Sequence, residues 1–155
     1  MSLQLRKALS RDVTQMHDLL MAGADKGLLL PRSRAQLFTA LRDFFVLEDE
    51  ENGKIAGCCA LAIIWEGLAE VRSLYVSAEY RRQGLGARLV TACLEDAVSF
   101  GIPQVFTLTY QTEFFASLDF GVVPKETLPQ KIWTDCIHCP KFPNCDEIAM
   151  IRSVG

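Results

Sequence analysis

The stretch that decides the fold is residues 71–90, which read VRSLYVSAEYRRQGLGARLV. Apolar and β-branched residues run up to Val76 and predict a strand. A short basic loop follows, and the apolar spacing from Ala87 onward predicts an amphipathic helix. A strand, a glycine-punctuated loop and a helix start together predict an anion site. The first backbone N–H groups of the helix point at one spot, and the helix dipole favours negative charge there.

The loop Arg81–Gly86 carries the features of a phosphate-binding turn. Gly84 and Gly86 let the main chain approach a phosphate because neither has a Cβ, and Arg81 and Arg82 add positive charge. The loop lacks the Gly-Lys-Ser/Thr of a P-loop and the third glycine of a dinucleotide fingerprint. The alternative is an ordinary strand-to-helix turn whose glycines serve close packing.

Composition predicts one compact globular domain. The chain has 155 residues, of which 50% are hydrophobic and 23% charged, so it can bury a sizeable core. A formal net charge of −3 without a long basic run argues against nucleic acid as a partner. No apolar segment reads as a signal peptide or a membrane span. Cys58 and Cys59 in an apolar strand, and Cys93 in a helix, favour a reduced, cytoplasmic protein over a secreted disulfide framework.

Helical and strand periodicities alternate along the chain, which predicts an α/β (α+β) layer fold. Asn52-Gly53 predicts a hairpin turn, and Ser33 with Gln36 predicts a capping box. The expected elements are a strand at 3–8, a helix at 10–22 capped by Ser10, a helix at 33–42, strands at 44–48, 54–65 and 70–76, a helix at 84–100, a strand at 104–109, a helix at 112–118, and two strands flanking a cysteine-rich loop near the C-terminus.

The order strand, Arg-Arg-x-Gly-x-Gly, helix resembles the acetyl-CoA pyrophosphate loop of the GNAT acyltransferases, and Arg81–Gly86 fits that signature without a gap. The resemblance starts near Leu3 and covers almost the whole chain. It implies a GNAT fold, with a central mixed, mostly antiparallel sheet flanked by helices, as a single domain over residues 1–155. It also implies acetyl-CoA as co-substrate. The residues expected to contact it are Leu74, Tyr75, Val76, Arg81, Arg82, Gln83, Gly84, Leu85, Gly86 and Ala87.

Acetyl transfer to an amine requires a base for the amine and an acid for the departing thiolate. Ala69-Glu70 matches the position of the general base in GNAT histone acetyltransferases, and partial burial at a strand start can raise a carboxyl pKa. A solvent-facing Glu70, with Glu66 as a weaker base, is the alternative. Many GNAT enzymes place a tyrosine that acts as general acid where this chain has Phe115, so Tyr110 is the nearest candidate acid. The alternatives are a water molecule and a thiolate that leaves without a dedicated acid.

Three segments resemble the short bacterial N-acetylglutamate synthases that lack a kinase domain. They are LPRS at 30–33, VFTLTYQTEFF at 105–115 and KIWTDCIHCPKFPNCDE at 131–147. This resemblance implies transfer of acetyl from acetyl-CoA to L-glutamate, the first step of arginine biosynthesis. L-Glutamine is a second or preferred acceptor in this interpretation.

An amino-acid carboxylate is best held by a bidentate guanidinium. Arg32 precedes a helix start, where positive charge opposes the dipole, and this favours a binding role over a merely solvated one. Ser33 could add a hydroxyl or an N–H group. Arg72 is a second candidate because it shares a strand face with Glu70. Arg34 is a weaker one.

Cys136, Cys139 and Cys145, with His138 between them, leave three interpretations open. The Cys-x-x-Cys spacing suits zinc, but a fourth ligand would have to be His138 or come from elsewhere. The alternatives are free thiols in a proline-stiffened loop and a disulfide between two of the three.

Other functions also stay open at this point. One is a non-catalytic acetyl-CoA or arginine sensor, suggested by Phe115 and the thiol loop. Another is acetylation of a protein or polyamine, although Arg32 and Arg72 would repel such basic acceptors. The apolar run Leu28–Leu30 could close over the acceptor or line a homodimer contact.

Overall fold

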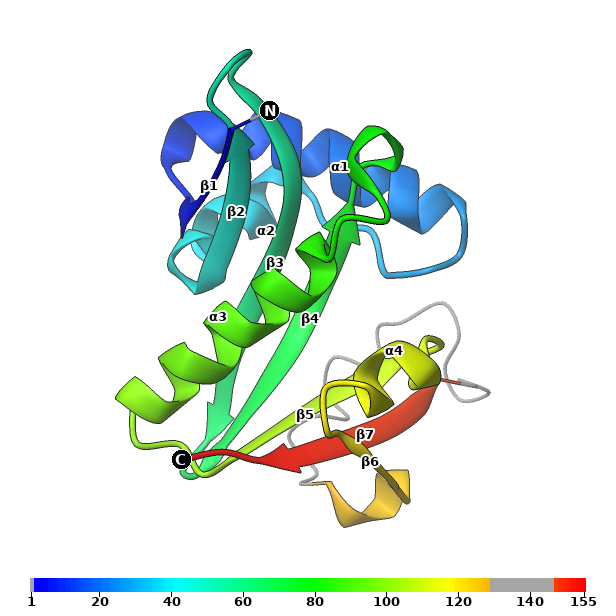
Figure 1. Ribbon diagram of the computed structural model, residues 1–155. Coiled ribbons are helices and arrows are strands. Elements are labelled where there is room, and N and C mark those ends of the chain that lie inside the picture. The colour runs from blue at the N-terminus through cyan, green and yellow to red at the C-terminus, as the bar shows by residue number, and fades with distance from the viewer. Residues whose placement is uncertain (1, 129–146) are drawn as a thin grey trace. The chain divides into compact units, whose positions relative to one another are not determined.

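The computed structural model describes residues 2–128 and 147–155. In these ranges the strands form one mixed sheet in the order β1-β2-β3-β4-β5-β7-β6 (Figure 1). The strands are β1 Leu3–Lys7, β2 Phe44–Asp49, β3 Lys54–Trp65, β4 Leu68–Val76, β5 Gln104–Thr109, β6 Gly121–Val123 and β7 Ile148–Ser153. The α-helices are α1 Val13–Asp25, α2 Arg34–Thr39, α3 Leu85–Ser99 and α4 Thr112–Ala116. The predicted fold class, a mixed and mostly antiparallel sheet with helices, is confirmed.

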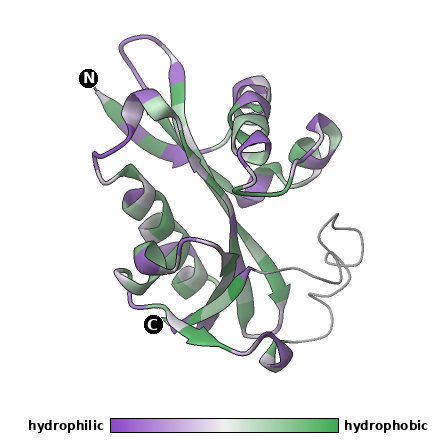
Figure 2. Cartoon of the chain, turned by 90° about the vertical axis from the view of Figure 1, so that its right-hand side faces the viewer, coloured by the Kyte–Doolittle hydropathy of each residue, from purple (hydrophilic) through white to green (hydrophobic). Residues whose placement is uncertain are grey.

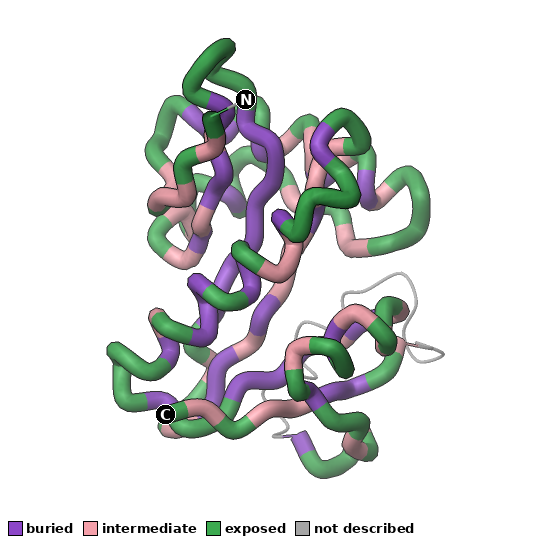
Figure 3. Tube along the Cα trace, in the orientation of Figure 1, coloured by how far each residue is buried: buried purple, intermediate pink, exposed green. Residues whose placement is uncertain are grey.

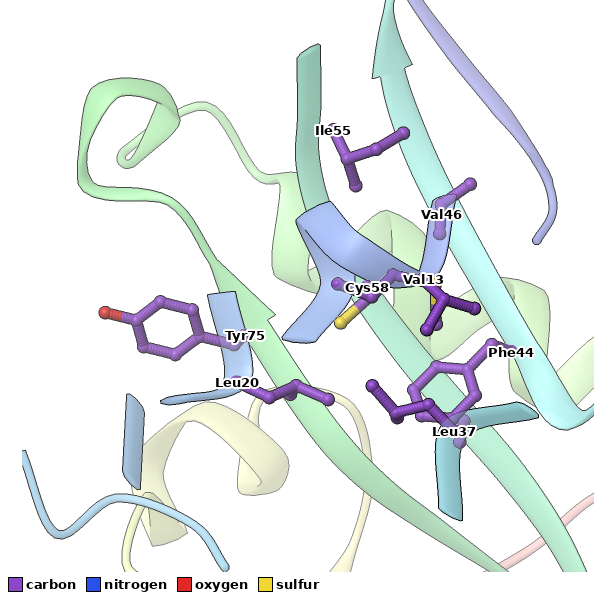
Figure 4. Packing of buried hydrophobic residues seen from close by; sticks show 10 residues of the cluster. Val13, Leu20, Leu37, Phe44, Val46, Ile55, Cys58 and Tyr75 are labelled. Carbon is purple, nitrogen blue, oxygen red and sulfur yellow. The ribbon is translucent and has the colours of Figure 1, made fainter. Parts of the chain in front are cut away.

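The chain divides into two compact units. The first unit comprises Met1–Leu61 and Val71–Asp96, and the second comprises Ala62–Glu70 and Ala97–Gly155. In the first unit, α1 and α2 pack on one face of β2, β3 and β4 (Figure 4). The buried residues of this core are Val13, Met16, Leu20, Leu37, Phe44, Val46, Ile55, Cys58, Ala60 and Tyr75.

Strand β3 is buried on both faces over most of its length (Figure 3). Cys58 belongs to the core beneath α1, whereas the neighbouring Cys59 lies with its Sγ atom 3.7 Å from Sγ of Cys93 in α3. Because successive side chains of a strand point to opposite faces, α3 covers the face opposite to α1. The helices themselves carry both hydrophilic and hydrophobic residues, as expected for elements with one buried side (Figure 2).

In the second unit, β5 lies between β4 and β7. It pairs in parallel with residues 68–70 of β4 and antiparallel with β7 along its whole length. Strand β7 pairs in turn with β6. The buried residues of this core are Leu68, Phe106, Leu128 and Ala149. The two strands expected near the C-terminus are therefore β6 and β7.

The start of the first helix differs from the prediction. Residues Ser10–Asp12 form a 3-10 turn, and α1 begins only at Val13. Ser10 makes no cap; instead the Leu9 N–H donates to Oδ2 of Asp12 at 2.7 Å. Arg6 holds both carboxylate oxygens of Asp12, at 2.7 and 3.0 Å. Arg6, a residue of β1, thus helps to set where the helix begins. A capping rule that considers only the residues at the helix start cannot predict this.

The other boundaries differ from the prediction by a few residues. The capping box between Ser33 and Gln36 is confirmed, but α2 ends at Thr39, and a 3-10 turn follows where the helix was expected to continue. The Asn52-Gly53 hairpin between β2 and β3 is also confirmed. None of the helices in the described ranges is both long and apolar enough to cross a membrane.

Candidate active site

Glu70 is the third residue of β4 rather than its first, because the strand begins at Leu68. It is half-buried, and it stands opposite Phe106 at the last position of the β4–β5 register. In the second unit it therefore marks the point where the parallel pairing of these two strands ends.

Strand β4 contains an irregularity that the sequence did not predict. Ser73 has a φ of 56°, in the left-handed region that a residue with a Cβ rarely adopts. Such a conformation costs on the order of 1–2 kcal/mol and persists only where the surroundings enforce it. The Cys58 thiol donates to the Ser73 carbonyl oxygen over 3.7 Å. The regular alternation of β4 is therefore interrupted directly after Arg72.

The loop after β4 is anchored before it reaches the glycines. The Ser77 N–H donates to the Ala56 carbonyl at 2.8 Å. Tyr80 is buried, and its hydroxyl donates to Oδ2 of the buried Asp49 at 2.9 Å. The sequence does not predict this anchor, because its only local signal is an aromatic residue immediately before the basic loop.

The loop leads directly into α3, as predicted. Arg82 and Gly84 both lie in the left-handed region, with φ of 66° and 72°, and α3 begins at Leu85. The Arg88 N–H donates to the Gly84 carbonyl at 3.2 Å, so the N–H groups of residues 85–87 belong to the first turn. First-turn N–H groups have no acceptor within their own helix and can receive an anion.

The two arginines of the loop differ in their surroundings. Arg81 folds back onto the end of β4, where Nη2 donates to the Tyr75 hydroxyl at 2.9 Å and Nε to the Val76 carbonyl at 3.2 Å. Arg82 is exposed, as is Gln83. The two arginines look equivalent in the sequence, but in the structure Arg81 secures the loop and Arg82 lies on its surface.

The remaining cofactor candidates also differ in exposure. Leu85 is buried, whereas Gly86 and Ala87 are half-buried. On β4, Leu74 and Val76 are half-buried, while the Tyr75 ring belongs to the core beneath α1 (Figure 4).

The residues predicted to bind the acceptor amino acid all belong to the first unit: Arg32, Ser33 and Arg72. Arg32 is half-buried and Arg34 exposed. The Ser33 hydroxyl accepts from the Gln36 N–H at 3.1 Å, so capping already occupies it.

Arg72 is half-buried and lies within electrostatic reach of Asp43. Burial raises the pKa of Asp43, and the charge of Arg72 opposes that rise. Arg72 therefore has a carboxylate of this chain in its neighbourhood.

In the second unit, Phe115 of α4 is buried and packs edge-on against two other rings. Its centroid lies 5.0 Å from that of Phe114 and 5.2 Å from that of Phe120. A phenylalanine ring in this position has no proton to donate, so Phe115 cannot act as a general acid. Tyr110, the alternative acid, is half-buried and follows β5 directly.

The predicted thiol cluster Cys136, Cys139 and Cys145 lies outside the described residues. Within the described ranges no group of histidine, cysteine or acidic side chains could hold a metal ion. The three cysteines described, Cys58, Cys59 and Cys93, are buried free thiols. Burial raises the pKa of Cys58 to about 12.

Sequence relatives of the chain are acetyltransferases. The chain is 38% identical to an uncharacterised N-acetyltransferase of Chlorobaculum tepidum over 150 residues, which cover 97% of this chain and 96% of the relative. It is 34% identical to the amino-acid acetyltransferase of Mycobacterium tuberculosis over 117 residues, or 75% of this chain and 67% of that one.

Solved structures similar to this chain include proteins that bind coenzyme A. N-acetylglutamate synthase from Neisseria gonorrhoeae, complexed with coenzyme A and N-acetyl-glutamate, superposes with a TM-score of 0.89 and 27% identity, covering all of this chain but 36% of the synthase. Rv2747 from Mycobacterium tuberculosis, solved with CoA and a second ligand, superposes with a TM-score of 0.86 and 26% identity over 98% of this chain and 99% of that one.

The family itself follows from the match of residues 13–120, which contain α1, the central strands, the glycine loop and α4. Together with the sheet order and the turn into α3, this match shows that the chain belongs to the acetyltransferase (GNAT) family.

Proposed function

We propose that this chain transfers the acetyl group of acetyl-CoA to the α-amino group of L-glutamate, giving N-acetyl-L-glutamate and CoA. The observation that carries the proposal is the turn from β4 into α3, where left-handed Arg82 and Gly84 precede a helix start whose N–H groups can receive the CoA pyrophosphate. A relative named amino-acid acetyltransferase and a structural neighbour named N-acetylglutamate synthase support an amino acid as acceptor.

The cofactor lies on residues of β4 and α3 in this proposal. The pyrophosphate binds the N–H groups from Arg82 to Ala87, and the pantetheine arm pairs with the backbone of residues 74–76. That backbone polarises the acetyl carbonyl, where negative charge develops in the transition state. Gly84 suits close approach, because a Cβ built there meets no atom of the described chain within 4 Å.

The chemical step needs two proton transfers. The amine nitrogen attacks the thioester carbonyl, and Glu70 accepts the proton that the nitrogen loses, directly or through water. The tetrahedral intermediate then collapses, the C–S bond breaks, and the CoA thiolate leaves. Tyr110 or a water molecule supplies the proton to the thiolate, because Phe115 has none to give.

The acceptor is held by Arg32, whose guanidinium pairs with a carboxylate of the amino acid. L-Glutamine shares the α-carboxylate and is the nearest competitor. The product is the first intermediate of arginine biosynthesis, and the chain would catalyse entry into that route.

A thiol-release assay with acetyl-CoA against all twenty amino acids, spermidine and a lysine-rich peptide tests the proposal. We expect release of CoA with glutamate, with glutamine next and basic acceptors inactive. Release with basic acceptors alone would replace the amino-acid function by protein or polyamine acetylation. Binding of acetyl-CoA without turnover of any acceptor would favour the sensing module.

A further inference from the structure

Two cations converge on one tyrosine oxygen at the end of β4 in the first unit. Arg81 Nη2 donates to the Tyr75 hydroxyl oxygen at 2.9 Å, and Lys26 Nζ donates to the same oxygen at 3.3 Å. Both cations also lie over the Tyr75 ring, with Arg81 Cζ 5.3 Å and Lys26 Nζ 6.0 Å from its centroid. The acetyl transfer proposed above assigns no role to Lys26 or to the Tyr75 hydroxyl.

Tyr75 is held rigidly in place. The residue is 6% exposed, and its ring packs at the edge of the core beneath α1, with the hydroxyl directed away from the other labelled side chains (Figure 4). Helix α1 makes room for this ring through Gly23, because a Cβ there would lie 2.8 Å from Cδ1 of Tyr75. Glycine is a poor helix former, so its presence opposite the ring indicates that the space is needed.

The cluster is positively charged and its hydrogen bonding is incomplete. Two hydrogen bonds to one oxygen bring the cations within about 6 Å of each other. In the part of the chain that the structure describes, neither Lys26 nor Arg81 forms an ion pair. The Tyr75 hydroxyl accepts from both cations, and its own proton has no acceptor among the described residues. A tyrosine hydroxyl can donate as well as accept, so this proton is available to a ligand.

We propose that Lys26, Tyr75 and Arg81 form a binding site for an oxyanion. The Tyr75 hydroxyl donates its proton to one oxygen of the ligand, and Lys26 Nζ and Arg81 Nη1 donate to the others. The buried ring fixes the central donor, and both cations are exposed, so a ligand can reach them. The anion also offsets the repulsion between the two cations.

The ligand has at least two negatively charged oxygens. Within the proposed function, on which this choice of ligands rests, two sources carry that chemistry: a carboxylate of the acceptor amino acid and a phosphate of CoA. Charge-assisted hydrogen bonds favour both, so the source is decided by experiment.

Isothermal titration calorimetry on the wild-type chain, Tyr75→Phe and Lys26→Gln tests the proposal with CoA, dephospho-CoA, L-glutamate and isoglutamine. Tyr75→Phe keeps the ring and removes only the hydroxyl, and thermal unfolding verifies that the variant folds. We expect each variant to bind the oxyanion ligand about tenfold more weakly, the loss expected for one charge-assisted hydrogen bond. The loss in Lys26→Gln should shrink at high salt.

Lys54→Gln is the matched control, because Lys54 is an exposed lysine of the same unit that pairs with the exposed Glu79 at 3.5 Å. It should bind all four compounds as the wild type does. If Lys54→Gln weakens binding as much as Lys26→Gln, the effect reflects net charge and the site is refuted.

The pattern of losses identifies the source. A loss for CoA but not dephospho-CoA assigns the 3′-phosphate, and an equal loss for both assigns the pyrophosphate. A loss for glutamate with CoA unchanged assigns the site to a carboxylate of the amino acid. Isoglutamine lacks the α-carboxylate and keeps the side-chain carboxylate. A loss with isoglutamine as well therefore assigns the side-chain carboxylate, and an unchanged affinity for isoglutamine assigns the α-carboxylate. Unchanged affinity for all four ligands in Tyr75→Phe overturns the proposal. Binding is measured without turnover, so the CoA measurements stand even if glutamate is not acetylated.

Discussion

The hydroxyl of Tyr80 donates a hydrogen bond to Oδ2 of Asp49 at 2.9 Å, and both residues are buried. Asp49 ends β2, while Tyr80 immediately precedes Arg81 and the glycine loop. Asn52 of the hairpin turn donates to the same hydroxyl over 3.5 Å. The β2–β3 hairpin therefore anchors Tyr80, the residue immediately before the glycine loop.

Removing this contact should affect both stability and cofactor binding. Tyr80→Phe leaves Oδ2 of Asp49 without a partner among the described residues, which costs on the order of 1–3 kcal/mol of unfolding free energy. Urea denaturation measures that loss. The KM for acetyl-CoA should rise as well, because the loop loses an anchor. A destabilised variant with an unchanged KM would show that the contact supports the fold without positioning the loop.

Gly84→Ala should weaken acetyl-CoA binding beyond its effect on stability. Gly84 and Gly53 both have a φ of 72°, and a Cβ on either meets nothing within 4 Å. Both alanine variants should therefore lose about 1–2 kcal/mol of stability through backbone strain alone. Only at Gly84 would the new Cβ face a ligand, so only that variant should show a raised acetyl-CoA KM. Equal KM values in the two variants would remove the loop from the cofactor site.

Glu70→Gln should lower kcat about 10²-fold or more at neutral pH, the usual contribution of a general base. The deficit should narrow as the pH rises, because the free amine then forms without help. Glu66→Gln is the control and should keep wild-type kcat. A deficit in Glu70→Gln that is constant across pH would indicate a structural role, and a deficit in Glu66→Gln alone would transfer the base to that residue.

Arg32→Ala should lower kcat/KM for glutamate about ten- to a hundred-fold, the equivalent of a charge-assisted contact of about 1.5–3 kcal/mol. Arg32→Lys should recover part of the activity, since an ammonium cannot make the planar fork. Arg34→Ala, at the exposed first residue of α2, is the control. An equal loss for glutamate and glutamine places Arg32 on the α-carboxylate, and wild-type kinetics would exclude it from the site.

Asp12→Asn should destabilise the chain in a pH-dependent way. Burial acts to raise the pKa of Asp12, but hydrogen bonds from Arg6 and the Leu9 N–H outweigh it and hold the pKa below 3.8. A lowered pKa means that the ionised group stabilises the fold above the unfolded value of 3.8, and that this contribution is lost as the pH falls through the folded value. At neutral pH we expect a loss of about 1.5–3 kcal/mol.

Urea denaturation at neutral and acidic pH measures this difference, which should shrink below pH 3.8. Asp43→Asn is the comparison of opposite sign, because burial raises the pKa of Asp43. Its stabilising contribution is present below the unfolded value and is lost as the pH rises through the folded one, so Asp43→Asn should not destabilise at neutral pH. A parallel loss in both variants would contradict this assignment.

The sequence by itself determined the elements and their order. The Asn52-Gly53 hairpin, the Ser33–Gln36 capping box and the strand–loop–helix around Gly84 all appear where they were predicted. Each rests on residues within a few positions of one another. Turn chemistry, capping and side-chain periodicity act over that range, so they can be read without knowing the rest of the fold.

Only the tertiary structure decided how the loop is anchored and where its charges lie. Asp49 and Tyr80 are 31 positions apart, and Lys26 and Tyr75 are 49 apart. The left-handed Ser73 also depends on its neighbours, since its carbonyl accepts from Cys58 on the adjacent strand. Such contacts form only once the sheet pairs and α1 packs against it, so a pattern along the chain carries no record of them. For that reason Arg81 and Arg82 look equivalent in the sequence, while in the folded chain Arg81 is bonded to Tyr75 and Val76 and Arg82 is exposed.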